Sequence, residues 1–190
     1  MRKQLQSSRP SLDELRLREM QRSDLRDVVK LEHASFREPW RPGDFRRHLD
    51  QYHDYDCEVI VDLCDQVVGY VITTRPGMTM EIVNLAVAPA WRRIGVASWT
   101  IAALQAAARA LDGDQLLAFV RESNVAAQLL LRSQGFVCTL IRRDFYLLCA
   151  ESAYVFEWWP EQRRPFRVRF MPHNRISQYL PSAPAHDGTV

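Results

Sequence analysis

The chain has 190 residues, of which 47% are apolar and 25% are charged, and its formal net charge is +2. These values are typical of a soluble globular domain long enough to bury a core. A charge this close to neutral does not favour binding to bulk nucleic acid or to an anionic membrane. The most apolar stretch, residues 94–111, contains Gln105 and Arg109. It is too short and too polar to span a bilayer, so we expect no membrane partner.

Cysteine usage indicates a reducing compartment. Cys57, Cys64, Cys138 and Cys149 form no Cys-x-x-Cys pair, and no histidine stands at zinc-ligand spacing from them. Three of the four lie in apolar runs, as buried reduced thiols do. The first residues are charged, but no apolar stretch follows them, so they do not resemble a signal peptide. We expect a cytoplasmic protein without a metal site.

The first third of the chain predicts a lead, one strand and two helices. Residues 1–12 are polar and have no period, so we expect a disordered lead. An alternation of apolar and charged residues predicts a half-buried strand over 14–20. Ser23 can cap a first helix, which Pro39 ends. A second short helix is expected after Pro42.

The middle of the chain predicts three strands. Residues 57–61 and 67–72 flank a turn at Asp65 and predict a hairpin. Residues 80–87 are mostly apolar, as in a central strand, and Pro89 ends that strand.

The second half predicts alternating helices and strands. A helix rich in alanine and leucine is expected over about residues 95–111, closed by Gly113. The remaining elements are a strand over 115–120, a helix that Ser123 and Asn124 cap and Gly135 ends, and strands over 136–141 and 153–158. The order β-α-α-β-β-β-α-β-α-β-β predicts an α/β fold, a mixed central sheet flanked by helices on both faces.

The segment after the central strand carries the clearest functional signal. Arg92 and Arg93 precede Gly95, which opens the long helix. The free N–H groups of a helix start carry a partial charge of about +0.5, and glycine lets a phosphate approach the backbone. The arginines can add charge-assisted contacts. The pattern therefore fits a pyrophosphate site, or an ordinary helix start with solvated arginines. It matches neither a Rossmann fingerprint nor a P-loop.

Two motifs in this order resemble the GNAT superfamily of N-acetyltransferases. Residues 84–97 read Asn-Leu-Ala-Val-Ala-Pro-Ala-Trp-Arg-Arg-Ile-Gly-Val-Ala and resemble its acetyl-CoA motif. Residues 120–127, followed by Gly135, resemble its second motif. Residues 141–146 and 36–40 resemble the branch that acetylates the N-terminal alanine of a ribosomal protein.

The resemblance covers about residues 14 to 158 and implies a GNAT fold. It divides the chain into the lead, a GNAT domain over 13–159 and an extension over 160–190 that is basic and contains prolines. A basic strand in the extension could contact RNA. We favour the alternative that the extension packs on the domain or is solvated.

The resemblance also implies acetyl-CoA as co-substrate and a role for each motif position. Strand backbone would hold the pantetheine arm and the acetyl carbonyl, and the helix start would hold the pyrophosphate. Asn124 would bond to the pantetheine arm, or serve as a helix cap alone. The implied cofactor-binding residues are Leu85, Ala86, Val87, Arg92, Arg93, Ile94, Gly95, Val96, Ala97, Ser98 and Asn124.

Two positions depart from the ribosomal branch. Where that branch carries a glutamate before the Val-Arg of the second motif, this chain has Phe119. Where the branch carries a tyrosine, four residues before the glycine, this chain has Leu131. Neither side chain can take or give a proton, so the acid–base pair is absent from its usual positions.

Glu81 is the candidate replacement base. It lies four residues before Leu85, and the histone-acetylating branch of the superfamily keeps its base at the matching position. Residues 81, 83 and 85 share a strand face unless a bulge intervenes. The alternative is a solvated glutamate at a strand end. Tyr146 is the candidate acid for the CoA thiolate, and its alternative role is aromatic packing.

The predicted reaction is direct attack of a neutral amine on the acetyl thioester, without an acyl-enzyme. The favoured acceptor is a protein or peptide N-terminus. Two alternatives stay open. One is an enzyme that acetylates a small amine such as a polyamine or an aminoglycoside, and the other is a catalytically silent domain that binds acyl-CoA.

Overall fold

The computed structural model describes residues 11–111, 115–146 and 150–161. Within them the chain forms one seven-stranded sheet, four α-helices and three short 3₁₀ turns. The strands are β1 (Arg16–Glu19), β2 (Tyr55–Val61), β3 (Val67–Thr74), β4 (Thr79–Val87), β5 (Gln115–Arg121), β6 (Val137–Tyr146) and β7 (Glu151–Trp158). The helices are α1 (Leu25–Ser35), α2 (Pro42–Asp50), α3 (Val96–Ala110) and α4 (Val125–Ser133), and the turns are η1 (Leu12–Glu14), η2 (Arg22–Asp24) and η3 (Pro89–Trp91).

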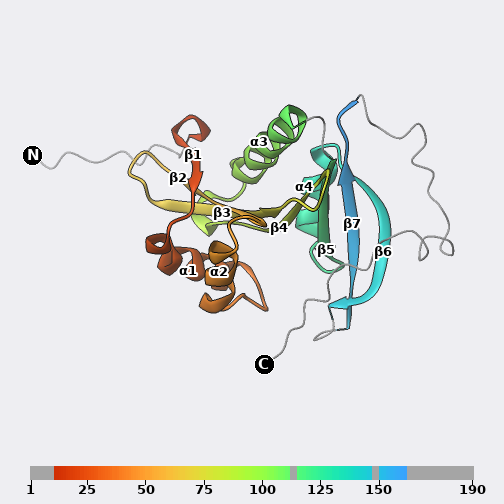
Figure 1. Ribbon diagram of the computed structural model, residues 1–190, viewed down its shortest axis with the longest axis horizontal. Helices are drawn as coiled ribbons and strands as arrows, with labels where there is room; N and C mark the ends of the chain where they lie inside the picture. The colour runs from red at the N-terminus through yellow and green to blue at the C-terminus, as the bar shows by residue number, and fades with distance from the viewer. Residues whose placement is uncertain (1–10, 112–114, 147–149, 162–190) are drawn as a thin grey trace, which may run out of the picture.

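The predicted α/β architecture is confirmed. The sheet order is β1-β2-β3-β4-β5-β7-β6, in which β4 and β5 run parallel and the other neighbours run antiparallel. Helix α3 is the crossover between the two parallel strands, as parallel pairing requires. Helices α1 and α2 cover one face of the sheet, whereas α3 and α4 cover the other (Figure 1).

Each face of the sheet has its own apolar core. On the α3 face, Ile101 and Leu104 pack with Met80 and Ile82 of β4 and with Leu131 of α4. On the α1 face, the core consists of Met20, Val28, Leu31, Phe45, Cys57, Val59, Val61, Tyr70, Ile72 and Ala86. Side chains alternate between the two faces along a strand, so membership in one core or the other shows which face a residue of β4 occupies.

The hairpin and most helix ends follow their local chemistry. Asp65 adopts a φ of 61° in the turn between β2 and β3, as an Asp in a tight turn often does. Asn124 accepts a hydrogen bond from the N–H of Ala127 at 3.1 Å and caps α4. The prediction that Ser23 caps the first helix is wrong, because Ser23 lies inside η2. The carboxylate of Asp24 instead accepts the backbone N–H of Gln21 at 2.8 Å.

The register between β3 and β4 shifts at Val83. Ile72 pairs with Asn84, whereas Thr73 pairs with Ile82, so Val83 is one extra residue on β4. Such a β-bulge bends its strand and places two consecutive side chains on the same face. Val83 packs with the α1-face core, and the next residue, Asn84, also points to α1.

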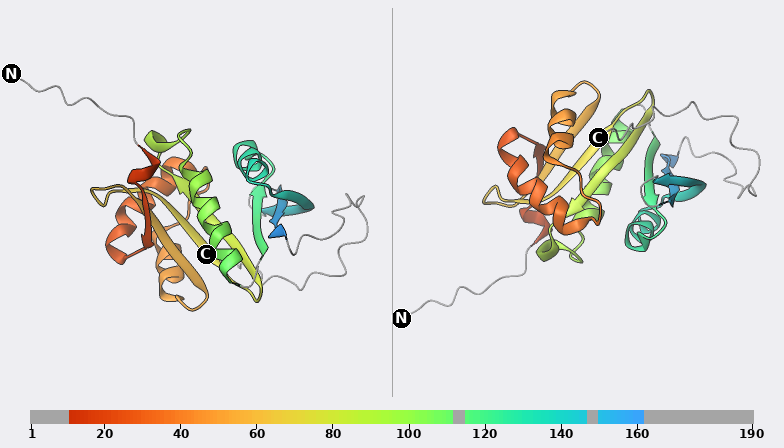
Figure 2. Two further views of the ribbon diagram at one scale, coloured as in Figure 1. Left: turned by 90° about the horizontal axis from the view of Figure 1, so that it is seen from above. Right: turned by 90° about the horizontal axis from the view of Figure 1, so that it is seen from below.

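Strands β4 and β5 pair over only part of their length. The ladder joins Thr79 through Ile82 to β5, although β4 continues to Val87 and β5 to Arg121. The two strands therefore separate beyond the bulge. Figure 2 shows them together at one end and apart at the other.

The last two strands are longer than the sequence predicts. β6 runs to Tyr146 rather than ending at 141, and β7 begins at Glu151. Asp144, at a φ of 51°, lies within a register irregularity between β6 and β7 that lets the strand continue past its polar residues. The expected closing residue Gly113, residues 1–10 of the lead and residues 162–190 of the extension lie outside the described residues.

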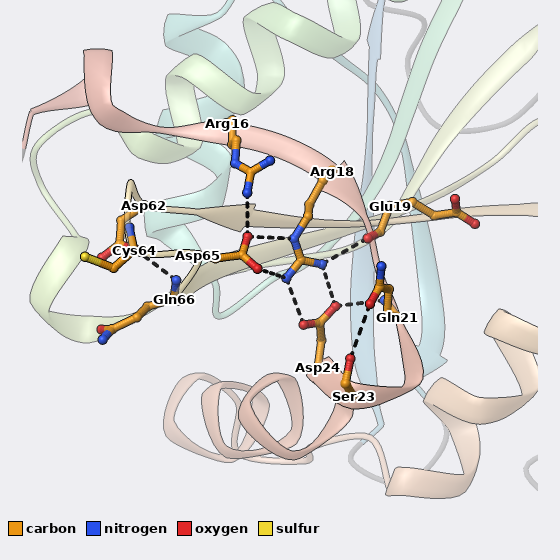
Figure 3. A network of polar contacts seen from close by, with 10 residues as sticks. All are labelled: Arg16, Arg18, Glu19, Gln21, Ser23, Asp24, Asp62, Cys64, Asp65 and Gln66. Carbon is orange, nitrogen blue, oxygen red and sulfur yellow. Dashed lines mark hydrogen bonds and ion pairs between the residues drawn. The ribbon is translucent and has the colours of Figure 1, made fainter.

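A polar network joins β1 to the β2–β3 turn and to the start of α1 (Figure 3). Arg18 makes a bidentate pair with Asp24, at 2.7 and 2.9 Å, and also contacts Asp65 at 3.0 Å. The Arg18 and Asp24 side chains are only 19% and 9% exposed, whereas Arg16, which also contacts Asp65, is 61% exposed. The hydrogen bonds from Arg18 hold the pKa of Asp24 below its ordinary value.

We predict that Arg18→Met lowers the free energy of unfolding at pH 7 by roughly 2–4 kcal/mol, because it leaves Asp24 without its cation. In the wild type, the lowered pKa of Asp24 adds stability above the ordinary aspartate value of ~3.9. That stability is lost as the pH falls through the lowered pKa. Urea denaturation at several pH values measures both effects. Arg16→Met is the matched control and costs less than about 1 kcal/mol; equal losses in the two variants contradict the prediction.

Candidate active site

The end of β4 presents backbone groups to the side that β5 has left. The N–H of Ala88 donates to the carbonyl of Val68 on β3 at 2.8 Å. Because successive residues of a strand point their N–H and C=O groups to opposite sides, those of Ala86 also face β3, where Ala86 pairs with Tyr70. Leu85 and Val87 therefore turn their backbone groups away from β3, to the side where β5 has separated.

The segment from Arg92 to Ser98 forms the turn into α3. Arg93 and Gly95 adopt positive φ values of 65° and 100°, which turn the backbone sharply twice within three residues. The first hydrogen bond into α3 is donated by the N–H of Trp99 to the carbonyl of Gly95 at 2.9 Å. The N–H groups of Val96, Ala97 and Ser98 thus precede the helical ladder, which gives this end of α3 its capacity for an anion.

Arg92 makes contacts on the protein itself. Its Nε donates to the carbonyl of Val87 at 2.8 Å, and its Nη2 donates to the hydroxyl of Ser35 at 2.9 Å. Both contacts join the turn to the end of β4 and to the end of α1. The side chain thereby braces the turn, and a phosphate contact through Arg92 stays a prediction.

Glu81 points to the α1 face of the sheet. Its neighbours Met80 and Ile82 belong to the core on the α3 face, so Glu81 lies on the opposite face by alternation. The bulge at Val83 does intervene, because Leu85 packs with the α3-face core. Glu81 and Leu85 therefore occupy opposite faces of β4.

The surroundings of Glu81 favour its neutral form. The side chain is partly buried, and burial raises its pKa above the ordinary glutamate value, while the positive charge of Arg142 opposes the rise. Glu81 contributes in turn to the raised pKa of Tyr55, after burial and Asp54. A carboxylate with a raised pKa is a better proton acceptor at neutral pH than an ordinary glutamate.

A buried carboxylate that the sequence reading missed anchors the bulge. Glu32 on α1 is 1% exposed and accepts hydrogen bonds from the hydroxyl of Tyr70 and from the N–H of Trp40, the latter at 2.9 Å. Nδ2 of Asn84 lies 3.5 Å from both carboxylate oxygens. Burial, followed by the charge of Glu32, raises the pKa of Tyr70. The signal in the sequence was a glutamate on the apolar stripe of α1.

An aromatic and basic cluster lies on β5 and β6, on the same face of the sheet as Glu81, which pairs with Leu117 of β5. Phe119 of β5 stacks on Phe145 of β6, with ring centroids 5.0 Å apart. Tyr146 donates its hydroxyl to the carbonyl of Phe119 at 3.4 Å, and the guanidinium of Arg121 lies 4.0 Å from the Tyr146 ring centroid. Tyr146 is thus held against β5.

A salt bridge ties the segment between α1 and α2 to this cluster. Glu38 of that segment, residues 36–41, contacts Arg121 at 2.7 Å, and Arg121 also contacts Glu151 at 3.2 Å. The N–H and hydroxyl of Ser123 and the cation of Arg121 lower the pKa of Glu151 to about 2. The ion pair places the segment over the α1-face side of β5.

The two positions that depart from the ribosomal branch have structural roles. Phe119 belongs to the aromatic stack on the α1 face, and Leu131 is buried in the α3-face core. Among the described residues, no three acidic, histidine or cysteine side chains gather as a metal site. Within the same ranges, no helix combines the length and the hydropathy of a bilayer span.

The structure brings most predicted site residues to the place where β4 and β5 separate, but divides them between two faces. The anion-binding start of α3 and the cap residue Asn124 of α4 lie with the helices of one face. Glu81 and the cluster around Phe119 lie on the other.

Comparison with known proteins gives a family. The model of the acetyltransferase (GNAT) family matches residues 25–136, which is more than half of the chain. None of the curated protein sequences compared with this chain matches it.

Solved structures share the fold. The ribosomal-protein-S18-alanine N-acetyltransferase of Escherichia coli is 24% identical, with a TM-score of 0.67 over 76% of this chain and 93% of that one. Arabidopsis thaliana NAA60 in complex with acetyl-CoA is 18% identical, with a TM-score of 0.67 over 77% and 99% of the two chains. The spermidine/spermine N-acetyltransferase SpeG of Vibrio cholerae is 20% identical, with a TM-score of 0.63 over 77% and 93%.

We predict that Gly95→Asp abolishes the rise in melting temperature that acetyl-CoA produces by binding the native state, because it puts a carboxylate where the pyrophosphate belongs. Any side chain at Gly95 is strained, since φ is 100° and a Cβ would lie 3.3 Å from Cδ1 of Leu12. Gly95→Asn is therefore the control, because it carries the same shape and strain without the charge. The comparison is made by thermal denaturation with and without acetyl-CoA. If Gly95→Asp keeps the wild-type shift, the pyrophosphate binds elsewhere.

We predict that Asn124→Ala lowers stability by about 1 kcal/mol through the lost cap and also reduces the shift that acetyl-CoA produces. Asn124→Ser separates the two effects, because serine still caps a helix but has no amide donor for the pantetheine arm. Thermal denaturation with and without acetyl-CoA measures both variants. A full cofactor shift in Asn124→Ser would leave Asn124 as a helix cap alone.

Proposed function

The chain belongs to the acetyltransferase (GNAT) family, and from this premise we propose that it moves the acetyl group of acetyl-CoA to the amine of a protein or peptide N-terminus. Acetyl-CoA is the co-substrate of this family, and the chain is a transferase that depends on it. The structurally similar proteins act on protein N-termini in one case and on spermidine or spermine in another. The acceptor is therefore the part that is proposed.

The observation that carries the proposal is the separation of β4 from β5 next to the start of α3. Backbone groups of Leu85 and the N–H of Val87 face the gap between the separated ends of β4 and β5 and would hold the pantetheine arm and the acetyl carbonyl, while the carbonyl of Val87 accepts from Arg92. The side chain of Ala86, between them, is buried in the α1-face core. The N–H groups from Arg93 to Ser98 would hold the pyrophosphate, and a backbone N–H directed at the developing oxyanion would stabilise it.

The proposed step is direct attack of a neutral amine on the thioester carbon, which forms the amide bond and releases the CoA thiolate. Glu81 would take the amine proton, directly or through one water. Its place on the α1 face supports this role, because the acceptor would approach from that face. Tyr146 would protonate the thiolate. That step is dispensable, because a thiol with a reference pKa of ~8.5 leaves readily.

An N-terminus is favoured over a small polyamine because of Arg142. Its guanidinium lies on the face that the acceptor would approach and would repel an acceptor with several ammonium groups, whereas the charge of Arg121 is already paired with Glu38 and Glu151. A screen of N-terminal peptides and small amines, with release of CoA as the readout, decides between the two. A protein that binds acetyl-CoA and acetylates no amine would instead be the silent acyl-CoA-binding domain.

We predict that Glu81→Gln lowers turnover of an N-terminal amine by about 10²–10⁴-fold in the pH range where the amine is still protonated and Glu81 is ionised. The base form of Glu81 increases as the pH rises through its pKa, which burial raises above the ordinary value. The acceptor becomes neutral without help above its own pKa of ~7.7. The wild-type advantage should therefore be largest between these two pKa values and shrink at higher pH.

The measurement is a pH–rate profile of both proteins on the best acceptor of the screen. Glu58→Gln is the matched control, because the pKa of Glu58 is also raised by burial but the residue lies on β2, away from the gap. A constant ratio between wild type and Glu81→Gln at every pH would exclude Glu81 as the proton acceptor.

A further inference from the structure

The guanidinium of Arg142 lies on the α1 face of the sheet, which the acceptor would approach. Arg142 lies on β6, and its partner across the ladder is Ala153 of β7, which is small and fully buried. The guanidinium extends past Ala153 to β5, where its Cζ lies 5.7 Å from the ring centroid of Phe119 and 5.5 Å from that of Phe145. The stacked aromatic pair therefore supports the guanidinium from β5 and β6.

The two arginines on this face differ in their partners. Arg121 is paired with Glu38 and Glu151. Arg142, which is half-buried, makes no ion pair within the described part of the chain. Its positive charge opposes the rise that burial causes in the pKa of Glu81. A half-buried guanidinium that is supported by rings and has no contacting carboxylate is suited to bind one from a ligand.

We propose that Arg142 binds a carboxylate of the acceptor, so that the enzyme selects amines that carry a carboxylate close to the reacting nitrogen. This inference rests on the proposed function and names its substrate class. The acceptor amine would lie beside Glu81 and the acceptor carboxylate beside Arg142, two groups of opposite charge on one face. An acidic side chain near a peptide N-terminus and the α-carboxylate of a free amino acid both supply this chemistry.

The same charge excludes polyamines. A second ammonium group placed near Arg142 would meet a like charge in a partly buried site, which is unfavourable. Arg121 does not replace Arg142 in binding the acceptor carboxylate, because two carboxylates of the chain already pair with it.

The test compares acceptors that differ by one carboxylate, with the full-length protein and acetyl-CoA. One arm uses peptides with aspartate at position one, two or three against the same peptides with asparagine. The other arm uses alanine against alaninamide, and spermidine serves as the cationic acceptor. Because a nearby carboxylate also raises the pKa of the amine, kcat/KM is expressed per neutral amine for every acceptor. We expect kcat/KM to be about tenfold or more higher for the carboxylate member of a pair, as a charge-assisted contact provides. The arm that shows the preference identifies the source of the carboxylate.

Arg142→Met should reduce this ratio toward one, mainly by raising KM for the carboxylate acceptor. Arg143→Met is the matched control, because Arg143 is the exposed neighbour on β6 and should leave the ratio intact. Assays run above the pKa of Glu81 keep that group ionised in every variant, so a change in its titration does not enter the ratio.

Turnover of asparagine peptides and alaninamide as fast as of their charged partners overturns the inference and leaves the proposed function standing. An equal loss for both members of a pair in Arg142→Met also overturns it, since it would indicate a structural role. Absence of turnover with every acceptor overturns both proposals.

Discussion

The separation of β4 from β5 is the constraint on which the rest of the site depends. A parallel pair that continued to Val87 would satisfy its backbone groups with its neighbour and leave none for a ligand. Because the ladder stops at Ile82, the last residues of β4 keep hydrogen-bonding capacity on one side while β3 holds them on the other. The start of α3 follows directly, so the strand end and the anion-binding turn stand next to each other by chain connectivity alone.

The bulge at Val83 determines which face of the sheet each residue of β4 occupies. It shifts the alternation of β4, so that Glu81 faces α1 while Leu85 faces α3. Phe119 belongs to an aromatic stack on β5 and cannot accept a proton. On the α1 face, Glu81 is the ionisable residue of β4 nearest in sequence to residues 85–87, whose backbone would hold the acetyl group. Under the proposed function, the cofactor and the acceptor would approach from opposite faces and would not displace one another.

Most elements could be predicted because local chemistry determines them. The hairpin around Asp65, the glycine at the start of α3 and the Asn124 cap each have a cause within a few residues. The bulge could not be predicted, since a run such as Glu81 to Val87 permits either alternation and the choice depends on contacts with α1. The end of β6 was missed because Arg142, Arg143 and Asp144 look like a turn, whereas Asp144 in a left-handed conformation lets the strand continue. The proposed roles of Glu81 as base and Tyr146 as acid depend on how near each side chain lies to the bound substrates, and a single sequence does not give these distances.

The buried Glu32 has a consequence for how this domain tolerates change. Its carboxylate accepts from the buried Tyr70 hydroxyl and lies 3.5 Å from the Asn84 amide. An apolar residue in place of Glu32 leaves the Tyr70 hydroxyl without this acceptor away from water, whereas replacing Tyr70 still leaves Glu32 with Asn84 and the N–H of Trp40. The costs of such substitutions are therefore not additive, and an apolar triple replacement of matched volume costs less than the sum of its single steps. Substitutions at Glu32 on α1, Tyr70 on β3 and Asn84 on β4 are therefore coupled, although these residues are far apart along the chain.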